Sequence, residues 1–369
     1  MSIGNIYVPS EGNPKADIFV VGEAGGQDEE DEKRPFVGKA GQFLERYFNM
    51  SGISREDLFL SNLSKFRPKY NKFEYLLESP ELKKGLEELK EEILTVNPKV
   101  ILALGNWPLY FLTGLRSDKK NAEPGSGISQ WRGSFVPSKL VEGCKVSITY
   151  HPAFVVRTTG FENHPIFLND IRRTIGESSY GEIRYPKYET IIDPPADRLA
   201  QIVEDFQRAE FLTVDIETFG SELACVGFCS SVDRAVCLTF RNSSRNWQAC
   251  KDILNGPAKK IFQYGVFDIN YLRWYYGWDT NNFAWDTYVA GNNLMPGFPK
   301  TLAFLTSIYT KFPYYKEDRK TWRASYDLDK LFNYNMKDVI ATHTIAMEQM
   351  KEIPEIYPSR ILYPPRCNA

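Results

Sequence analysis

Short apolar runs alternate with amphipathic segments in the first half of the chain. The apolar runs at 17–22, 58–63, 99–104 and 145–150 have the length and composition of buried strands. Between them, the segment 79–97 begins with Ser-Pro, a helix start, and its apolar residues recur at helical spacing: Leu82, Leu86, Leu89 and Ile93. Alternating strands and helices predict a parallel sheet covered by helices, a three-layer α/β fold.

The second half has a different order of elements. An apolar run at 211–218 is followed by short strand-like runs at 224–230 and 235–240, which predict a meander. A further strand is expected at 259–264 and a long closing helix at 329–350. The pattern predicts an α/β unit with a mixed sheet.

The chain of 369 residues is long enough for more than one domain. Residues 177–196 contain several glycines and prolines and little periodicity, so we expect a linker there. The expected organisation is a first domain at 1–176, this linker, a second domain at 197–352 and a tail at 353–369.

Composition excludes some classes of protein. Hydrophobic residues make up 43% and charged residues 25%, which is typical of a globular protein rather than a disordered one. The formal net charge of −2 gives no overall basic field, so nucleic acid phosphates would have to meet local patches or metal ions. The sequence shows no apolar run of membrane-spanning length and no signal peptide, so we expect no membrane partner and a cytoplasmic location.

Six cysteines are present, and none form a Cys-x-x-Cys pair. We expect reduced, buried thiols. A metal site on Cys225 and Cys229 is the weaker alternative, because no second cysteine pair supports it.

Candidate chemistry begins at Asp215 and Glu217, at the end of the apolar run at 211–218. Residues two apart on a strand point to the same face, so the two carboxylates would lie together and repel unless a cation such as Mg²⁺ or Mn²⁺ sits between them. The alternative is a pair of solvated acids at a strand end. Further ligands are available from Asp268, after the next strand, and from Asp338, which follows Tyr334 by one helical turn.

The motifs of the first half resemble those of the uracil-DNA glycosylase superfamily, in particular its iron-sulfur branch, family four. The resemblance covers about residues 15–175 and rests on four segments: Gly22–Gly26, Arg34–Gly41, Asn62 and His151–Ala153. It implies that Phe36 stacks on a flipped uracil, Asn62 reads the edge of the base, His151 donates to the oxygen that gains charge, and Glu23 positions or activates water. An amide can distinguish donors from acceptors, and a positioned donor is most effective where charge develops.

This resemblance has two departures. The family's cluster cysteines are missing, with Phe66 at one of their positions and none before Gly22 or in the helix at 80–96, so we predict no Fe-S cluster. Gly25 replaces a proline of the Gly-Glu-x-Pro-Gly pattern, which loosens that turn. Both an active glycosylase and a non-catalytic DNA-binding module remain open.

The second half is similar to the DEDD exonucleases, in their tyrosine-bearing subgroup, which have a ribonuclease H-like fold. The resemblance covers about residues 197–350 and rests on Asp215-x-Glu217, Asp268 and Tyr334-x-x-x-Asp338. It implies that four carboxylates hold two Mg²⁺ or Mn²⁺ ions about 4 Å apart, with Tyr334 orienting the attacking water. Tyr264 stands where the second motif usually has asparagine.

Both halves in this order resemble the amino-terminal part of certain large-phage family A DNA polymerases. The resemblance implies a phage-encoded, proofreading-type 3′-5′ exonuclease that acts on DNA 3′ ends, including uracil-containing ones, with a polymerase domain or subunit as partner. Two alternatives remain: an exonuclease whose first domain only binds DNA, and a non-catalytic replisome scaffold.

Overall fold

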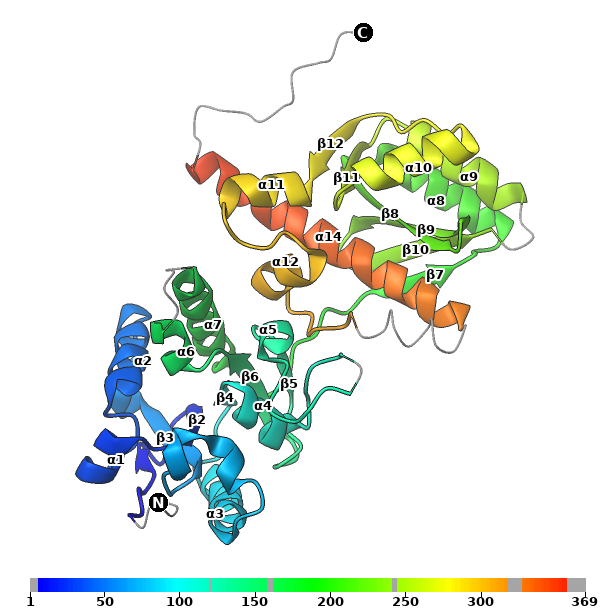
Figure 1. Cartoon of the computed structure of the whole chain (residues 1–369). Coiled ribbons are helices and arrows are strands. Elements are labelled where there is room, and N and C mark those ends of the chain that lie inside the picture. The colour runs from blue at the N-terminus through cyan, green and yellow to red at the C-terminus, as the bar shows by residue number, and fades with distance from the viewer. Residues whose placement is uncertain (1–5, 120, 158–161, 241–243, 317–326, 357–369) are drawn as a thin grey trace. The chain divides into compact units, whose positions relative to one another are not determined.

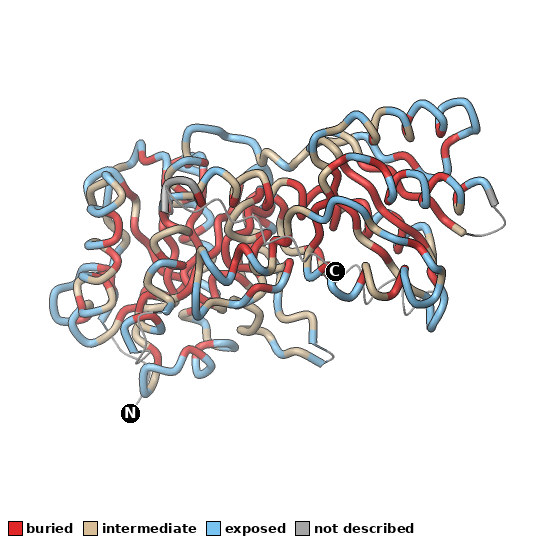
Figure 2. Tube along the Cα trace, turned by 90° about the horizontal axis from the view of Figure 1, so that it is seen from above, coloured by how far each residue is buried: buried red, intermediate tan, exposed pale blue. Residues whose placement is uncertain are grey.

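The structure is a computed structural model, and it describes residues 6–119, 121–157, 162–240, 244–316 and 327–356. The chain divides into two compact units, Met1–Arg184 and Tyr185–Ala369 (Figure 1). Each unit has a buried interior, drawn red in Figure 2, and most residues of its inner strands are buried. No helix of the described residues is both long and apolar enough to cross a membrane.

The first unit is built on a six-stranded sheet in the order β1-β3-β2-β4-β6-β5. The four inner strands are parallel, and the two edge strands pair antiparallel to their neighbours. The strands are β1 (Glu11–Gly12), β2 (Ile18–Ala24), β3 (Leu58–Ser64), β4 (Val100–Leu104), β5 (Phe135–Pro137) and β6 (Lys145–Thr149). The predicted parallel α/β fold is confirmed.

Helices cover both faces of this sheet, because the strand order reverses direction after β3 and successive crossovers then lie on opposite faces. The helices are α1 (Gln27–Glu32), α2 (Lys39–Met50), α3 (Pro80–Val96), α4 (Asn106–Thr113), α5 (Ile128–Trp131), α6 (Pro152–Arg157) and α7 (Asn163–Glu177). Helix α3 begins as predicted, since the Ser79 side chain accepts a hydrogen bond from Leu82 N at 3.1 Å. Its Gly85 lies directly against β3, because a Cβ there would be 2.4 Å from the Leu63 carbonyl oxygen.

The second unit has a six-stranded mixed sheet in the order β12-β11-β8-β9-β10-β7. Strands β8, β9 and β10 form the predicted antiparallel meander, whereas β11, β12 and β7 pair parallel with their neighbours. The strands are β7 (Glu189–Ile192), β8 (Phe211–Phe219), β9 (Glu222–Ser231), β10 (Arg234–Thr239), β11 (Lys259–Phe262) and β12 (Phe283–Asp286). The mixed α/β architecture is confirmed.

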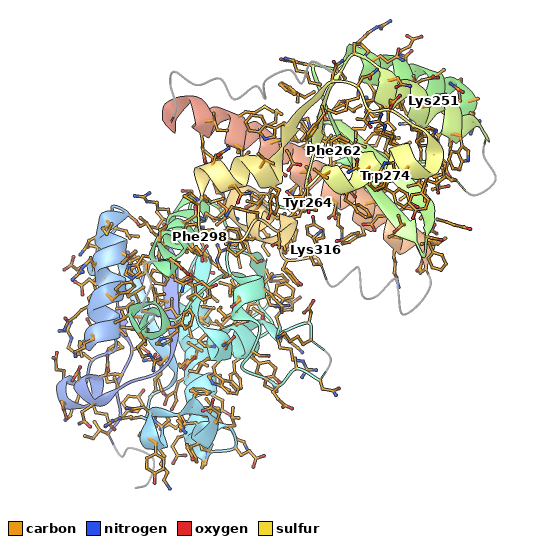
Figure 3. All side chains as sticks on the ribbon, turned by 45° about the horizontal axis from the view of Figure 1, so that its top comes forward. Lys251, Phe262, Tyr264, Trp274, Phe298 and Lys316 are labelled. Carbon is orange, nitrogen blue, oxygen red and sulfur yellow. The ribbon has the colours of Figure 1, made fainter. Side chains whose placement is uncertain are left out.

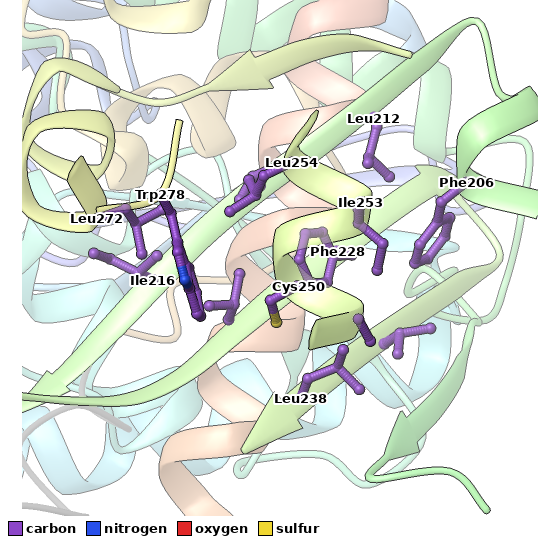
Figure 4. Close-up of a cluster of buried hydrophobic side chains, with 14 of the residues drawn as sticks. Phe206, Leu212, Ile216, Phe228, Leu238, Cys250, Ile253, Leu254, Leu272 and Trp278 are labelled. Carbon is purple, nitrogen blue, oxygen red and sulfur yellow. The ribbon is translucent and has the colours of Figure 1, made fainter. Parts of the chain in front are cut away.

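Each face of the second sheet carries its own apolar core. One face packs against α8 (Ala196–Arg208), α9 (Ser244–Asn255) and α10 (Val266–Tyr276), around the cluster drawn in Figure 4. The other face packs against α12 (Leu302–Tyr309) and the long α14 (Leu328–Ile356), while α11 (Thr287–Leu294) follows β12.

The side chains of β8 point alternately to the two faces of the sheet. Leu212, Val214 and Ile216 enter the core formed with α8, α9 and α10. The intervening positions face α14, since Thr213 Oγ1 lies 2.9 Å from His343 Nδ1. Asp215 therefore also faces α14, because residues two apart on a strand share a face.

The segment expected to be a linker is only partly one. Its first residue ends α7, and its later part contains β7, which pairs with β10 and closes one edge of the second sheet. The prolines at 194 and 195 do not disrupt β7, because they follow it and precede α8. The expected tail at 353–369 begins inside α14, and residues 357–369 lie outside the described part of the chain.

Candidate active sites

The residues singled out in the first unit meet at one edge of its sheet. Glu23 lies on β2, Asn62 on β3 and His151 directly after β6, and these strands are parallel. Phe36 comes from the loop between α1 and α2. All four side chains line one cavity of about 760 Å³. The cavity lies where the carboxyl ends of the strands open beside a reversal of strand order, the usual ligand position in such sheets.

Two glycines allow these side chains to approach one another. A Cβ at Gly22 would lie 2.4 Å from Asn62 Oδ1 and 2.7 Å from the Phe36 ring. A Cβ at Gly105, whose φ is +96°, would lie 3.0 Å from the His151 Cβ and 3.1 Å from Glu23 Oε1. No role was assigned to Gly105 from the sequence, although a glycine directly after a buried strand commonly marks a turn.

The loop that carries Phe36 is tied down by side chains that the sequence analysis did not identify. Arg55 donates to the carbonyl oxygens of Pro35 and Phe36 at 2.6 and 3.2 Å. Glu29 accepts from Gly26 N at 2.8 Å and from Gly38 N at 2.9 Å, so one carboxylate joins the two loops beside the cavity. Phe36 itself has a φ of +57°, which is uncommon for a bulky residue and depends on such support.

Burial shifts the pKa values of His151 and Glu23 toward their neutral forms. Burial lowers the pKa of His151 to about 4, with the charge of Arg157 adding to the effect. Its Nδ1 accepts a hydrogen bond from Ala153 N at 3.1 Å, which leaves the proton of the neutral ring on Nε2 as a donor. Burial raises the pKa of Glu23 to about 7, helped by the charge of Glu74 and opposed by a hydrogen bond from the Trp107 backbone.

The residues of the first unit do not fit an Fe-S cluster. Such a cluster is held by four cysteine thiolates, and Cys144 is the single cysteine among residues 1–184. The segments where the resemblance places cluster ligands do meet, but through other side chains. The Tyr7 and Phe66 rings lie 5.7 Å apart, and the Tyr7 hydroxyl donates to Glu88 of α3 at 2.9 Å.

In the second unit, carboxylates from two elements converge. Asp215 and Glu217 share one face of β8, and Asp338 comes from α14. One ligand oxygen of each lies within 4.8 Å of the others. This set of oxygen donors fits a hard divalent cation such as Mg²⁺ or Mn²⁺.

Asp268 is placed next to this group but not within it. It lies in the first turn of α10, and its Oδ1 accepts a hydrogen bond from Ile216 N at 3.1 Å, which fixes it against β8. Burial raises the pKa of Asp268 to about 7. Burial also raises the pKa of Asp215, and the charges of Asp338, Asp268 and Glu217 raise it further. Clustered buried carboxylates of this kind favour either protonation or a bound cation.

A lysine supplies positive charge at this site. This residue is Lys316, which is labelled in Figure 3. Its Nζ donates to both carboxylate oxygens of Asp338 at 2.8 and 2.7 Å and to the Tyr334 hydroxyl at 2.7 Å. The buried Tyr315 hydroxyl also donates to Asp338, at 2.7 Å. Tyr334 is recognisable from the sequence, and the run 313–316 also fits the resemblance to the exonucleases, but the sequence assigns no role to Tyr315 or Lys316.

The second exonuclease motif, which contains Tyr264 and Asp268, lies beside exposed aromatic side chains. Tyr264, in place of the usual asparagine, is 56% exposed and has a φ of +59°. Its backbone N–H and that of Gly265 donate to Asp286 at 3.1 and 2.8 Å, which holds this turn. On α10, Tyr271 is buried, whereas Trp274 is 77% and Tyr275 64% exposed, so most of these aromatic residues are not core residues.

Comparison with known families agrees with this division of the chain. A model described as the uracil DNA glycosylase superfamily matches residues 9–172, and one described as a 3′-5′ exonuclease matches residues 192–354. The type-4 uracil-DNA glycosylase of Saccharolobus solfataricus is 38% identical over 149 residues, which are 40% of this chain and 65% of that protein. That of Thermotoga maritima is 36% identical over 167 residues, 45% of this chain and 80% of that protein.

A more distant relative spans both units. The DNA polymerase of Bacillus phage SP01 is 24% identical over 216 residues, which are 56% of this chain and 21% of that protein. The matched segment is thus about a fifth of that polymerase, and the likeness to phage polymerases expected from the motifs is confirmed. Through residues 9–172 the chain belongs to the uracil-DNA glycosylase superfamily, and residues 192–354 form a 3′-5′ exonuclease domain.

Proposed function

We propose that the second unit removes nucleotides from the 3′ ends of DNA, using divalent cations held by Asp215, Glu217, Asp268 and Asp338. The convergence of three of these carboxylates within 4.8 Å carries the proposal. Bound Mg²⁺ or Mn²⁺ would supply a water of lowered pKa and stabilise charge at the scissile phosphate.

The chain's own residues then have separate tasks. Tyr334 orients the attacking water by hydrogen bonding. Its oxygen accepts from Lys316, so its own proton is directed elsewhere, and the phenol acts as a donor rather than a base. Tyr315 and Lys316 fix Asp338, and Ile216 N fixes Asp268. The exposed Trp274 and Tyr275 offer surfaces on which unpaired bases can stack.

In the first unit, the proposed activity is recognition and excision of uracil. The cavity of about 760 Å³ has room for a flipped nucleotide, and its four predicted side chains supply an aromatic face, an amide, a neutral imidazole donor and a carboxyl group. His151 donates from Nε2 to the uracil oxygen that gains charge. Glu23 positions water once it is ionised. The unit works without an Fe-S cluster, because it lacks the thiolates.

The exonuclease proposal is tested on a 3′-labelled single strand. We expect the full chain to release labelled nucleotide with Mg²⁺ and to stop when chelator is added. Asp215→Ala should abolish release, whereas Asp233→Ala, an exposed acid on the β9–β10 turn, should leave it unchanged. An inert wild-type protein would contradict the proposal and favour the scaffold alternative.

The glycosylase proposal is tested in the presence of chelator, which silences the exonuclease. We expect release of free uracil from a uracil-containing strand, and loss of that release in His151→Ala. Retained DNA binding without uracil release in the wild type would instead support a non-catalytic binding module. His164→Ala is the matched control, since this histidine contacts Tyr47 and does not line the cavity.

The relationship to phage polymerase extends the proposal to the partner. We propose that the two units act beside a polymerase domain or subunit, with DNA 3′ ends as the shared substrate. Addition of a family A polymerase should then leave mismatched or uracil-bearing 3′ ends more often trimmed than extended. Equal extension with and without this chain would argue against the partnership.

A further inference from the structure

Asn335 lies between the candidate metal-binding residues without being one of them. It follows Tyr334 on α14, is fully buried, and faces β8 and β9. Its Nδ2 donates to Asp215 Oδ2 at 2.8 Å and to the Asp215 carbonyl oxygen at 3.2 Å. One amide group therefore binds both the side chain and the backbone of the same aspartate.

The orientation of this amide follows from its surroundings. If the group were turned over, its oxygen would face two oxygens of Asp215 and both hydrogen bonds would be lost. As it stands, Oδ1 has no hydrogen-bond partner among the described residues and lies over Gly227 of β9. A Cβ at Gly227 would be 2.2 Å from that oxygen, so the glycine is what gives the amide its space. The unpaired carbonyl costs free energy, which the paired bonds to Asp215 offset.

The amide limits how the Asp215 carboxylate can turn. A carboxyl group on a strand can rotate about its last torsion with little cost, because this torsion is broad. The bond from Asn335 Nδ2 to Oδ2 restrains that rotation and fixes Oδ2 toward α14. The second bond, to the Asp215 carbonyl oxygen, holds the amide itself in place against β8. The plane of the carboxylate is then set before any cation arrives, while Asp215 still offers a ligand oxygen within 4.8 Å of those of Glu217 and Asp338.

We propose that Asn335 is a positioning residue that orients Asp215 for divalent cation binding. The inference rests on the proposed function in that Asp215 is taken as a metal ligand. It adds a residue that the Tyr-x-x-x-Asp pattern leaves unspecified, since the position after the tyrosine carries no assigned role in that pattern.

The test is the affinity of the full chain for Mn²⁺ alone, measured by titration calorimetry. Asn335→Leu keeps the branched shape and removes both donors. We expect its Mn²⁺ affinity to fall roughly 10- to 100-fold, the usual effect of losing a group that orients a metal ligand. Asn333→Leu is the matched control, because Asn333 lies two residues earlier on α14, is exposed, and donates only to the Asp329 carbonyl oxygen at 2.8 Å. The Mn²⁺ affinity of Asn333→Leu should equal that of the wild type.

A second variant separates orientation from packing. Asn335→Ser is smaller, and its hydroxyl is too short to reach Asp215, so the same loss of Mn²⁺ affinity is expected if Asn335→Leu fails to fold. Melting in chelator checks that each variant is folded. Wild-type Mn²⁺ affinity in a folded Leu or Ser variant overturns the proposal, even if the variant melts at a lower temperature.

Hydrolysis of a 3′-labelled strand, measured in parallel, separates this inference from the proposed function. We expect Asn335→Leu to be slow at low Mn²⁺ and to recover as Mn²⁺ is raised, because the ligand itself is still present. A wild type that binds Mn²⁺ but does not hydrolyse DNA would overturn the exonuclease proposal and leave the positioning role intact. A variant that binds Mn²⁺ normally yet stays slow at every concentration would overturn the positioning role.

Discussion

Burial in the fold moves the pKa values of individual side chains away from their ordinary values. Glu23 and His151 face the same cavity, and burial moves both toward neutrality, the carboxyl group to a pKa of about 7 and the imidazole to about 4. Neutral partners are suited to binding an uncharged base. Their titration is therefore the first property to measure.

Glu23 should make the stability of the first unit depend on pH. Its pKa is about 7 in the fold against an ordinary 4.5, so the native carboxyl keeps its proton where the unfolded chain has lost it. The stability that it contributes is fully present below about pH 4.5 and is lost as the pH rises through 7. The difference in unfolding free energy between wild type and Glu23→Gln should therefore fall by about 3 kcal/mol over that interval.

Calorimetric unfolding at pH 4.5, 6 and 8 measures this difference. Glu87→Gln, on the surface of α3, serves as the control and should show the same pH dependence as the wild type. A constant difference between wild type and Glu23→Gln would mean that Glu23 has the same pKa in the folded and the unfolded chain.

Lys316 should stabilise the second unit when no metal is bound. Its ammonium group contacts Asp338 in the middle of several carboxylates, so Lys316→Met leaves their repulsion without a nearby cation. Removing one partner of a largely buried pair costs about 3 kcal/mol. We expect a lower melting temperature in chelator and a smaller deficit with Mg²⁺, because the divalent ion replaces the missing charge.

The control for this substitution is Lys330→Met, a half-exposed lysine near the start of α14 that pairs with Asp327 at 3.5 Å. It should melt like the wild type under both conditions. If Lys316→Met lowers the melting temperature by the same amount with and without Mg²⁺, the electrostatic explanation is contradicted.

Helix α3 depends on one close contact with its neighbouring strand. At Gly85 a Cβ would meet the Leu63 carbonyl oxygen at 2.4 Å, and a backbone atom cannot move aside cheaply. Gly85→Ala should destabilise the first unit by about 1–3 kcal/mol, in spite of the higher helix propensity of alanine.

Gly176, near the end of α7, is the matched control. No atom lies within 4 Å of a Cβ built there, so Gly176→Ala should stabilise the unit by about 0.5–1 kcal/mol through helix propensity alone. Melting curves of the two variants should shift in opposite directions. Equal shifts would show that the contact with β3 does not matter.

The exposed face of α10 is expected to bind unpaired bases. Base–aromatic stacking is worth about 1–3 kcal/mol per base, so replacing both Trp274 and Tyr275 with alanine should weaken single-strand binding at least roughly tenfold. The measurement is fluorescence anisotropy of a labelled strand in an Asp215→Ala background, which prevents cutting. Tyr185→Ala, an exposed tyrosine far along the chain from α10, should bind normally. Unchanged binding in the double variant would indicate that this face contacts protein instead.

At the scale of the whole molecule, each unit contains its own sheet and its own buried core. Residues 1–184 and 185–369 expressed separately should therefore each fold and melt cooperatively. Circular dichroism of the two pieces should add up to that of the full chain. A piece that is unfolded alone would show that its core is incomplete without the other unit.

Much of the fold could be predicted because the period of the apolar residues differs between strands and helices. The parallel strands of the first unit and the start of α3 at Ser79 follow from that signal. The strand β7 could not be predicted, because it is a short edge strand, one of its four residues is buried, and it is stabilised by pairing with β10. Trp274 and Tyr275 are large aromatic residues of the kind that usually fill a core, yet on α10 they are exposed, and only the packing of the helix shows this.

The sequence by itself determined which residues are candidates for the chemistry. Asp215 and Glu217 are two residues apart on a strand, and Tyr334 and Asp338 are one turn apart on a helix, so a local period that can be read from local sequence places each pair on one face. The tertiary structure alone decided what surrounds them. Lys316 meets Asp338 and Asn335 meets Asp215 across 22 and 120 positions of the chain. Such contacts depend on how α14 packs on the sheet, and no local pattern encodes that packing.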